Sequence, residues 1–141
     1  MPKVNICSLP YLSEVITQWK PTDVVSSVPI EAPGNVEWHP SYIDDIYDAQ
    51  LLSYKQAIRS VLGIEGARIL IHCKQGMSRS SALAIVKLFQ FDRSGQTVLG
   101  FLEDHPEAEP NPLILLFGDE ILVTHGAIVK ACSSRYKGRN L

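Results

Sequence analysis

Two kinds of hydrophobic pattern alternate along the chain, and their alternation predicts an α/β fold. Short runs rich in β-branched and other apolar residues are typical of strands. They lie at Val4–Ser8, Asp23–Val28, Val36–His39 and Arg68–His72. Longer segments with an apolar stripe or an apolar surface are typical of helices. They lie at Leu12–Lys20, Ala49–Leu62, Ser80–Asp92 and Gln96–Asp104. This order predicts a three-layer-like sandwich, with a central, mostly parallel sheet flanked by helices.

The last part of the chain carries a strong signal for the start of a helix. Asn111 can cap a helix, and Pro112 suits its first position. The apolar residues that follow predict one final helix that runs to about Ala131. The tail RYKGRNL, which begins at Arg135, is polar and is predicted to fray.

Length and charge limit the classes of protein to which the chain can belong. Its 141 residues fit a single domain over 1–141, and an apolar fraction of 45% is ordinary for a globular protein. The 13 basic and 15 acidic residues leave a net charge of −2, which gives no general reason to bind nucleic acid or a membrane. No apolar run approaches the ~20 residues that span a bilayer, and no signal peptide is recognisable.

The three cysteines, Cys7, Cys73 and Cys132, have no disulfide-framework spacing. They predict free thiols in a reducing compartment, and hence a cytoplasmic protein. The four histidines are scattered without the spacing of metal ligands, so neither a metal nor another cofactor is expected.

The loop HCKQGMSRS, residues 72–80, leads from a predicted buried strand into a predicted buried helix. Backbone N–H groups at a helix start have no partner within the helix, and the helix dipole adds positive charge there. Such a loop forms a concave site for an anion. Gly76 permits the tight backbone path, and Arg79 offers a planar fork that matches two oxygens of a phosphate.

The same electrostatic field favours the thiolate form of Cys73, which would make it a nucleophile aimed at the bound anion. Ser80 can donate its hydroxyl hydrogen to that sulfur when the thiolate is the leaving group. His72 is expected to hold the loop by hydrogen bonds rather than to act as a base.

These residues resemble a known family. HCKQGMSRS matches the HCxxGxxRS signature of cysteine-dependent protein phosphatases of the dual-specificity class. The segments YIDDI and HPEAEPNPLILLFGDEIL are similar to those of compact bacterial members. The resemblance implies a dual-specificity phosphatase fold, with Cys73 forming a phosphocysteine and Arg79 holding the phosphoryl oxygens. It also implies that the phosphate is bound by backbone amides from six residues: Lys74, Gln75, Gly76, Met77, Ser78 and Arg79.

The resemblance further implies a general acid, an aspartate some thirty residues before the cysteine. Asp44 and Asp45 lie 29 and 28 positions before Cys73, and Asp48 lies 25 before it. The Asp-Ile pattern favours Asp45, whereas the spacing favours Asp44. Alternatively, these carboxylates only cap the helix that follows them.

The expected activity is metal-free hydrolysis of phosphate monoesters, on a phosphorylated protein or a small phosphate ester. Phosphotyrosine is the first candidate, with phosphoserine and phosphothreonine next. Lys74 directly after the cysteine also occurs in relatives that act on inositol lipids, but Met77 and Ser78 stand where those carry a second basic residue. A phosphoinositide or small-molecule phosphatase, and a non-catalytic phosphate-binding pseudophosphatase, remain the alternatives.

Overall fold

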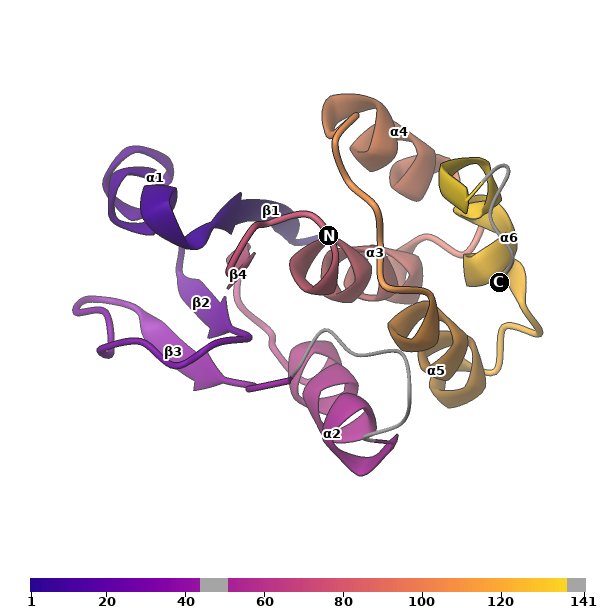
Figure 1. Cartoon of the computed structure of the whole chain (residues 1–141), viewed down its shortest axis with the longest axis horizontal. Coiled ribbons are helices and arrows are strands. Elements are labelled where there is room, and N and C mark those ends of the chain that lie inside the picture. Colours follow the sequence, from indigo (N-terminus) through magenta and orange to yellow (C-terminus); the bar gives the residue numbers. More distant parts are fainter. Residues whose placement is uncertain (44–50, 137–141) are drawn as a thin grey trace.

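The computed structural model describes residues 1–43 and 51–136 of the chain. A four-stranded sheet lies at its centre, with the strand order β1-β4-β2-β3 and every neighbouring pair parallel (Figure 1). The strands are β1 (Lys3–Ser8), β2 (Asp23–Ser26), β3 (Glu37–Pro40) and β4 (Arg68–Cys73). The sheet confirms the predicted α/β class, and each strand lies within two residues of its predicted bounds.

Helices cover both faces of the sheet. They are η1 (Leu9–Tyr11), α1 (Leu12–Trp19), α2 (Leu51–Leu62), α3 (Arg79–Phe91), α4 (Gln96–Asp104), α5 (Pro112–Leu122), α6 (Ala127–Ala131) and η2 (Ser133–Tyr136). On one face α1 packs over a small core that contains Val24 and Leu70. On the other face α3 is buried along most of its length and lies at the centre of the larger core (Figure 1). The pattern of α3, apolar nearly all round, therefore predicted its central place.

The single final helix predicted to run from Pro112 to about Ala131 is wrong. The structure has two helices there, because the chain turns between Val123, with φ 56°, and Gly126, with φ 84°. The carboxylate of Asp119, which is 5% exposed, accepts hydrogen bonds from the amides of Ile128 at 2.9 Å and Val129 at 3.1 Å. One buried acidic side chain thus caps a second helix, α6.

The predicted fraying of the tail is also wrong for its first two residues. Arg135 Nη1 donates to the carbonyl oxygens of Pro106, at 2.7 Å, and Ala108, at 3.2 Å. Tyr136 is 7% exposed and donates its hydroxyl hydrogen to the carbonyl of Pro110. These contacts fasten the last described turn to the segment before α5. Residues 137–141 lie outside the described residues.

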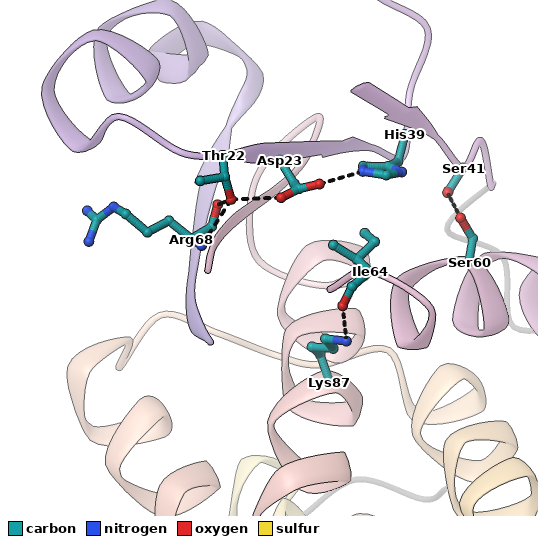
Figure 2. A network of polar contacts seen from close by, with 8 residues as sticks. All are labelled: Thr22, Asp23, His39, Ser41, Ser60, Ile64, Arg68 and Lys87. Atoms are coloured by element: carbon teal, nitrogen blue, oxygen red, sulfur yellow. Dashed lines mark hydrogen bonds and ion pairs between the residues drawn. The ribbon is translucent and has the colours of Figure 1, made fainter. Parts of the chain in front are cut away.

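Polar contacts join neighbouring strands of the sheet and fasten α3 to the segment after α2 (Figure 2). Asp23 accepts from the Thr22 hydroxyl at 2.7 Å and lies 2.9 Å from Nε2 of His39, which ties β2 to β3. The buried ammonium of Lys87 on α3 donates to the carbonyl oxygens of Leu62, at 3.1 Å, and Ile64, at 2.7 Å. Within the described residues, no helix is both long and apolar enough to cross a membrane.

Candidate active site

The loop between β4 and α3 surrounds a small pocket at the carboxyl edge of the sheet. The pocket has a volume of about 220 Å³ and is lined by Cys73, Lys74, Gln75, Ser78 and Arg79. Cys73 is the last residue of β4 and is only 2% exposed, so its thiol lies at the base of the pocket. Ligands of parallel α/β sheets bind at this edge, beyond the ends of the strands.

The sulfur of Cys73 has two hydrogen-bond partners. The amide of Gly76 donates to Sγ at 3.1 Å, and the Ser80 hydroxyl oxygen lies 3.2 Å from it. Gly76 has φ 75°, and a Cβ atom there would lie 2.7 Å from the amide nitrogen of Ser8. Only glycine fits this close approach of the loop to the end of β1. In this backbone conformation the Gly76 amide reaches the sulfur of Cys73. Both groups lie within hydrogen-bonding distance of the sulfur.

Backbone amides from outside the loop hold three of its carbonyl groups. Leu9 N donates to the carbonyl of Lys74 at 3.1 Å, Glu109 N to that of Met77 at 2.9 Å, and Asn111 N to that of Ser78 at 3.0 Å. These anchors come from both ends of the chain, the start of η1 and the segment before α5. The loop is therefore fixed by segments far from it in sequence.

The anchored carbonyls determine where the next amides point. In a planar trans peptide, the C=O and the following N–H point in opposite directions. Because the carbonyls are held outward, the N–H groups of Gln75, Ser78 and Arg79 turn away from the anchors. These three residues line the pocket. The arrangement gives a cradle of amides at the start of α3, where the helix dipole also attracts an anion.

The guanidinium of Arg79 is only partly used by the protein. Its Nη1 donates to the carbonyl oxygen of Ile43 at 2.9 Å. Its Nε is buried and has no hydrogen-bond partner among the described residues. A buried donor without a partner is costly, and a ligand in the pocket can satisfy it. Arg79 therefore keeps hydrogen-bonding capacity for an anion.

The candidates for the general acid cannot be placed in this geometry. Asp44, Asp45 and Asp48 lie outside the described residues, and their roles stay predictions. Ile43, the last described residue before them, is the one whose carbonyl Arg79 binds.

His72 is fully buried, and its Nε2 lies 2.6 Å from the hydroxyl oxygen of Ser26. Burial lowers the pKa of His72 to about 4, opposed only in part by the backbone of Cys73. The imidazole is neutral at ordinary pH, and its printed hydrogen bond goes to β2 rather than to the loop, so the predicted role in holding the loop stays a prediction.

The other two cysteines are distinguished from Cys73 by their surroundings. All three are free. Burial raises the pKa of Cys7 to about 12, with a smaller contribution from Cys73, and burial raises the pKa of Cys132 to about 12. Both thiols stay protonated at neutral pH, and neither lines the loop pocket.

Sequence reasoning missed the anchors of the loop. Leu9 and Glu109 act through their backbone amides, and because almost every residue type has such an amide, the sequence does not reveal this role. Asn111 was predicted only to cap a helix. Its side chain does accept hydrogen bonds from the amides of Leu113 and Ile114 at the start of α5. Its backbone amide, in addition, donates to the carbonyl of Ser78. Among the described residues, no three His, Cys, Asp or Glu side chains gather as metal ligands.

No protein-family profile and no curated protein matches the sequence. Solved structures do match. The chain is similar to DUSP15, at 16% identity over 93% of this chain and 91% of that one, with a TM-score of 0.66. It is similar to a single-substitution variant of human DUSP28, at 23% identity over 87% of this chain and 93% of that one, with a TM-score of 0.64.

It is also similar to the core catalytic domain of the PP-IP phosphatase SIW14 from S. cerevisiae, at 16% identity over 93% of this chain and 96% of that one, with a TM-score of 0.55. These likenesses extend over nearly the whole chain and agree with the resemblance seen in HCKQGMSRS. The strand order, the cradle and the matches together show that this chain has the fold of the dual-specificity phosphatases.

Proposed function

We propose that the protein hydrolyses phosphate monoesters through a phosphocysteine on Cys73. One observation carries the proposal. The buried sulfur of Cys73 accepts a hydrogen bond from the Gly76 amide and lies beside the Ser80 hydroxyl. The pocket above it is lined by Arg79, whose Nε has no hydrogen-bond partner among the described residues. A structural cysteine would need neither the donors nor the pocket. The fold of the dual-specificity phosphatases supports the same chemistry.

In the first step, the Cys73 thiolate attacks phosphorus, so that an S–P bond forms and the bond from phosphorus to the leaving oxygen breaks. The phosphoryl oxygens are held by the amides of the cradle and by the fork of Arg79. The leaving oxygen takes a proton from the general acid, for which we propose Asp45, with Asp44 as the alternative.

In the second step, water attacks the phosphorus of the phosphocysteine, and the S–P bond breaks. The same carboxylate, now ionised, accepts the proton from water. The sulfur leaves as a thiolate, and the Ser80 hydroxyl, 3.2 Å away, stabilises it by donating a hydrogen bond. Inorganic phosphate is released, and the enzyme returns to its starting state.

For the substrate, we propose a phosphorylated protein, with phosphotyrosine first and phosphoserine or phosphothreonine next. Lys74 and Arg79 are the only cationic side chains among the residues that line the pocket. Two cations suit one phosphate group, whereas a densely phosphorylated inositol would benefit from more. The free thiols support the further proposal of a cytoplasmic location.

The likeness to SIW14 and the place of Lys74 keep one second candidate, an inositol phosphate or other small phosphate ester. Phosphate release should be measured side by side from phosphotyrosine peptides, phosphoserine peptides, inositol phosphates and phosphoinositides. Faster turnover of the inositol compounds would reverse the preference proposed above.

The central test is replacement of Cys73 by serine. Cys73→Ser should reduce hydrolysis of an aryl phosphate to background, a loss of about 10⁴-fold or more. It should keep the fold and the binding of phosphate. Rapid acid quench of the wild type followed by mass spectrometry should find the phosphoryl group on Cys73. Cys132→Ser is the matched control, because Cys132 is equally buried but lies away from the pocket.

Substantial activity in Cys73→Ser would exclude the covalent mechanism. A wild type that binds vanadate but releases no phosphate from any substrate would instead identify a phosphate-binding pseudophosphatase.

A further inference from the structure

The last described turn, η2, holds the segment before α5, residues 105–111, through two side chains. Nη1 of Arg135 donates to the carbonyl oxygen of Ala108 at 3.2 Å, and its guanidinium also reaches three other carbonyl oxygens in α4 and directly after it. The hydroxyl of Tyr136 donates to the carbonyl oxygen of Pro110. Arg135 is half-buried and Tyr136 is buried, so water has little access to these contacts.

A first line of hydrogen bonds leads from Arg135 to the pocket. The carbonyl of Ala108 shares a peptide group with the amide of Glu109, and that amide donates to the carbonyl of Met77 at 2.9 Å. The carbonyl of Met77 shares the next peptide group with the amide of Ser78, a residue that lines the pocket. The peptide bonds of the described residues are all trans, so the C=O and N–H of each group point in opposite directions. The guanidinium is thus connected through two peptide groups to the Ser78 amide.

A second line runs beside it from Tyr136. The carbonyl of Pro110 shares a peptide group with the amide of Asn111, which donates to the carbonyl of Ser78 at 3.0 Å. The carbonyl of Ser78 shares the next peptide group with the amide of Arg79, which also belongs to the pocket wall. The Tyr136 hydroxyl is therefore connected through two peptide groups to the Arg79 amide. We call these two lines the peptide relays.

Part of what Arg135 does is ordinary helix capping. Its contacts with the carbonyls of Leu102 and His105 close the end of α4, as a basic side chain often does. Its contact with Ala108 and the contact of Tyr136 with Pro110 go beyond a cap, because they fall on the two peptide groups that anchor the loop.

The relays also affect the strength of the amides at their far ends. Hydrogen bonds in a chain polarise one another, so a donor at η2 makes the N–H at the pocket a better donor. Other groups share the load: the Ser81 hydroxyl lies 2.5 Å from the carbonyl oxygen of Met77 and 3.1 Å from that of Ser78, and Ala82 N donates to Ser78 at 3.2 Å. The effect of η2 on the cradle should therefore be moderate.

We propose that η2 is a positioning element of the active site: through the peptide relays, Arg135 and Tyr136 orient and polarise the Ser78 and Arg79 amides that face the bound anion. The inference rests on the proposed function in that the cradle is taken to bind a phosphoryl group. Neither Arg135 nor Tyr136 lines the pocket, so both act only through the segment before α5.

The first test is Tyr136→Phe, which removes one hydroxyl and keeps the buried ring. Vanadate affinity, measured by calorimetry, should fall about threefold, toward the low end of what one hydrogen bond contributes. In ¹H–¹⁵N spectra of the vanadate-bound protein, the amide protons of Asn111 and Arg79 should move upfield, and that of Ser78 should move less. Unchanged affinity with an unchanged Arg79 resonance would overturn the proposal.

The second test addresses the other relay. Arg135→Met keeps the length of the side chain and removes its donors, so it should weaken vanadate binding about threefold. It should shift the amide protons of Glu109 and Ser78 more than that of Arg79, the reverse of the pattern in Tyr136→Phe. Arg135→Lys, which keeps donors near Ala108, should restore much of the affinity. Identical patterns of amide shifts in the variants at the two positions would contradict two separate relays.

Arg93→Met is the matched control for stability. Nη1 of Arg93 donates to the carbonyl of Leu122 at 2.9 Å, which has no part in either relay. Vanadate binding is measured for each variant well below its own Tm, with the fold checked by circular dichroism. The affinity of Arg93→Met should equal that of the wild type. Equal losses in Arg93→Met and Arg135→Met would show that affinity follows stability, and would overturn the proposal.

The two proposals can fail separately. A wild type that binds vanadate but hydrolyses no ester, together with weaker binding in Tyr136→Phe, would remove the proposed reaction and keep the role of η2. A phosphoryl group found on Cys73 of the wild type, together with equal vanadate affinity in Tyr136→Phe, would do the reverse.

Discussion

Two arginines, Arg68 at the start of β4 and Arg79 at the start of α3, differ in how their donors are paired. Arg68 begins the strand; its Nε and Nη2 donate to the carbonyl of Trp19 at 3.2 and 2.7 Å, and its guanidinium lies 4.2 Å from the centre of the Trp19 ring. Arg79 follows the strand and leaves a buried Nε without a partner among the described residues. An arginine with its donors engaged by the protein stabilises the fold, whereas one with a spare buried donor indicates a ligand.

The same difference separates the two edges of the sheet. Near the start of β2 and on α3, Asp23 and Lys87 bind partners within the protein; Figure 2 shows Asp23 with Thr22 and His39, and Lys87 with Ile64. At the carboxyl edge, the amides of the loop surround a pocket. Asp23 and Lys87 are paired within the protein, whereas Arg79 keeps a buried donor without a partner among the described residues.

The strongest way to break this comparison is to replace each arginine by lysine. Arg79→Lys should lower kcat/KM about 10³-fold, because an ammonium cannot reproduce the bidentate fork on the phosphoryl oxygens. It should also abolish most of the rise in Tm that vanadate causes, since a ligand stabilises only what it binds. Arg68→Lys should cost stability and leave both quantities nearly unchanged. Equal responses of the two variants would show that the two arginines do not differ in this way.

Loss of the proposed general acid should be the next largest effect. Asp45→Asn should lower kcat about 10²-fold for an alkyl phosphate, whose leaving oxygen is basic, and much less for an activated aryl ester. It should also flatten the basic limb of the pH–rate profile. Asp44→Asn serves as the matched control and should cost little. The reverse pattern would assign the acid to Asp44, and no dependence on the leaving group would favour a pseudophosphatase.

Lys87→Met should affect stability alone. The change leaves the carbonyl of Ile64 without its donor and removes one of the two side-chain donors to the carbonyl of Leu62, so it should lower the free energy of unfolding by about 2 kcal/mol. The exposed Lys130→Met is the control and should stay within about 0.5 kcal/mol. Urea denaturation measures both, and an activity per folded molecule that falls in Lys87→Met would argue against a role in stability alone.

His72, near the carboxyl end of β4, gives the smallest effect, a dependence of stability on pH. Its pKa is about 4 in the folded protein against 6.5 in the unfolded chain, so the unfolded state binds more protons between these values. The stability that His72 provides while neutral is complete above pH 6.5 and is lost as pH falls toward 4. Between about pH 6.5 and pH 5, wild type should lose up to about 2 kcal/mol more than His72→Asn. Parallel slopes for the two proteins would contradict the lowered pKa.

Most elements of the fold could be predicted because local patterns determine them. The apolar run Arg68–His72 and the glycine- and serine-rich loop after it specify a strand, a turn and a helix without reference to distant residues. The break after Leu122 could not be predicted, because it depends on Asp119 reaching forward to the amides of Ile128 and Val129. The burial of Tyr136 likewise depends on a carbonyl 26 positions earlier.

In the candidate site, too, the features determined by neighbouring residues could be predicted, and those that depend on distant residues could not. The residues that line the pocket are adjacent in sequence and could be predicted together. The contact of Arg79 with Ile43 spans 36 positions, and the hydrogen bond of Ser26 with His72 spans 46. Neither contact has a sequence pattern of its own.

The use of main-chain amides as anchors of the loop bears on how far such a sequence can diverge. Any residue except proline carries an N–H, so the position of Leu9 can change its side chain and still hold the carbonyl of Lys74. Leu9→Ala should therefore keep vanadate binding, while Leu9→Pro should lose it. Support of this kind does not depend on the side chains at the anchoring positions, so substitutions there need not alter what those positions supply.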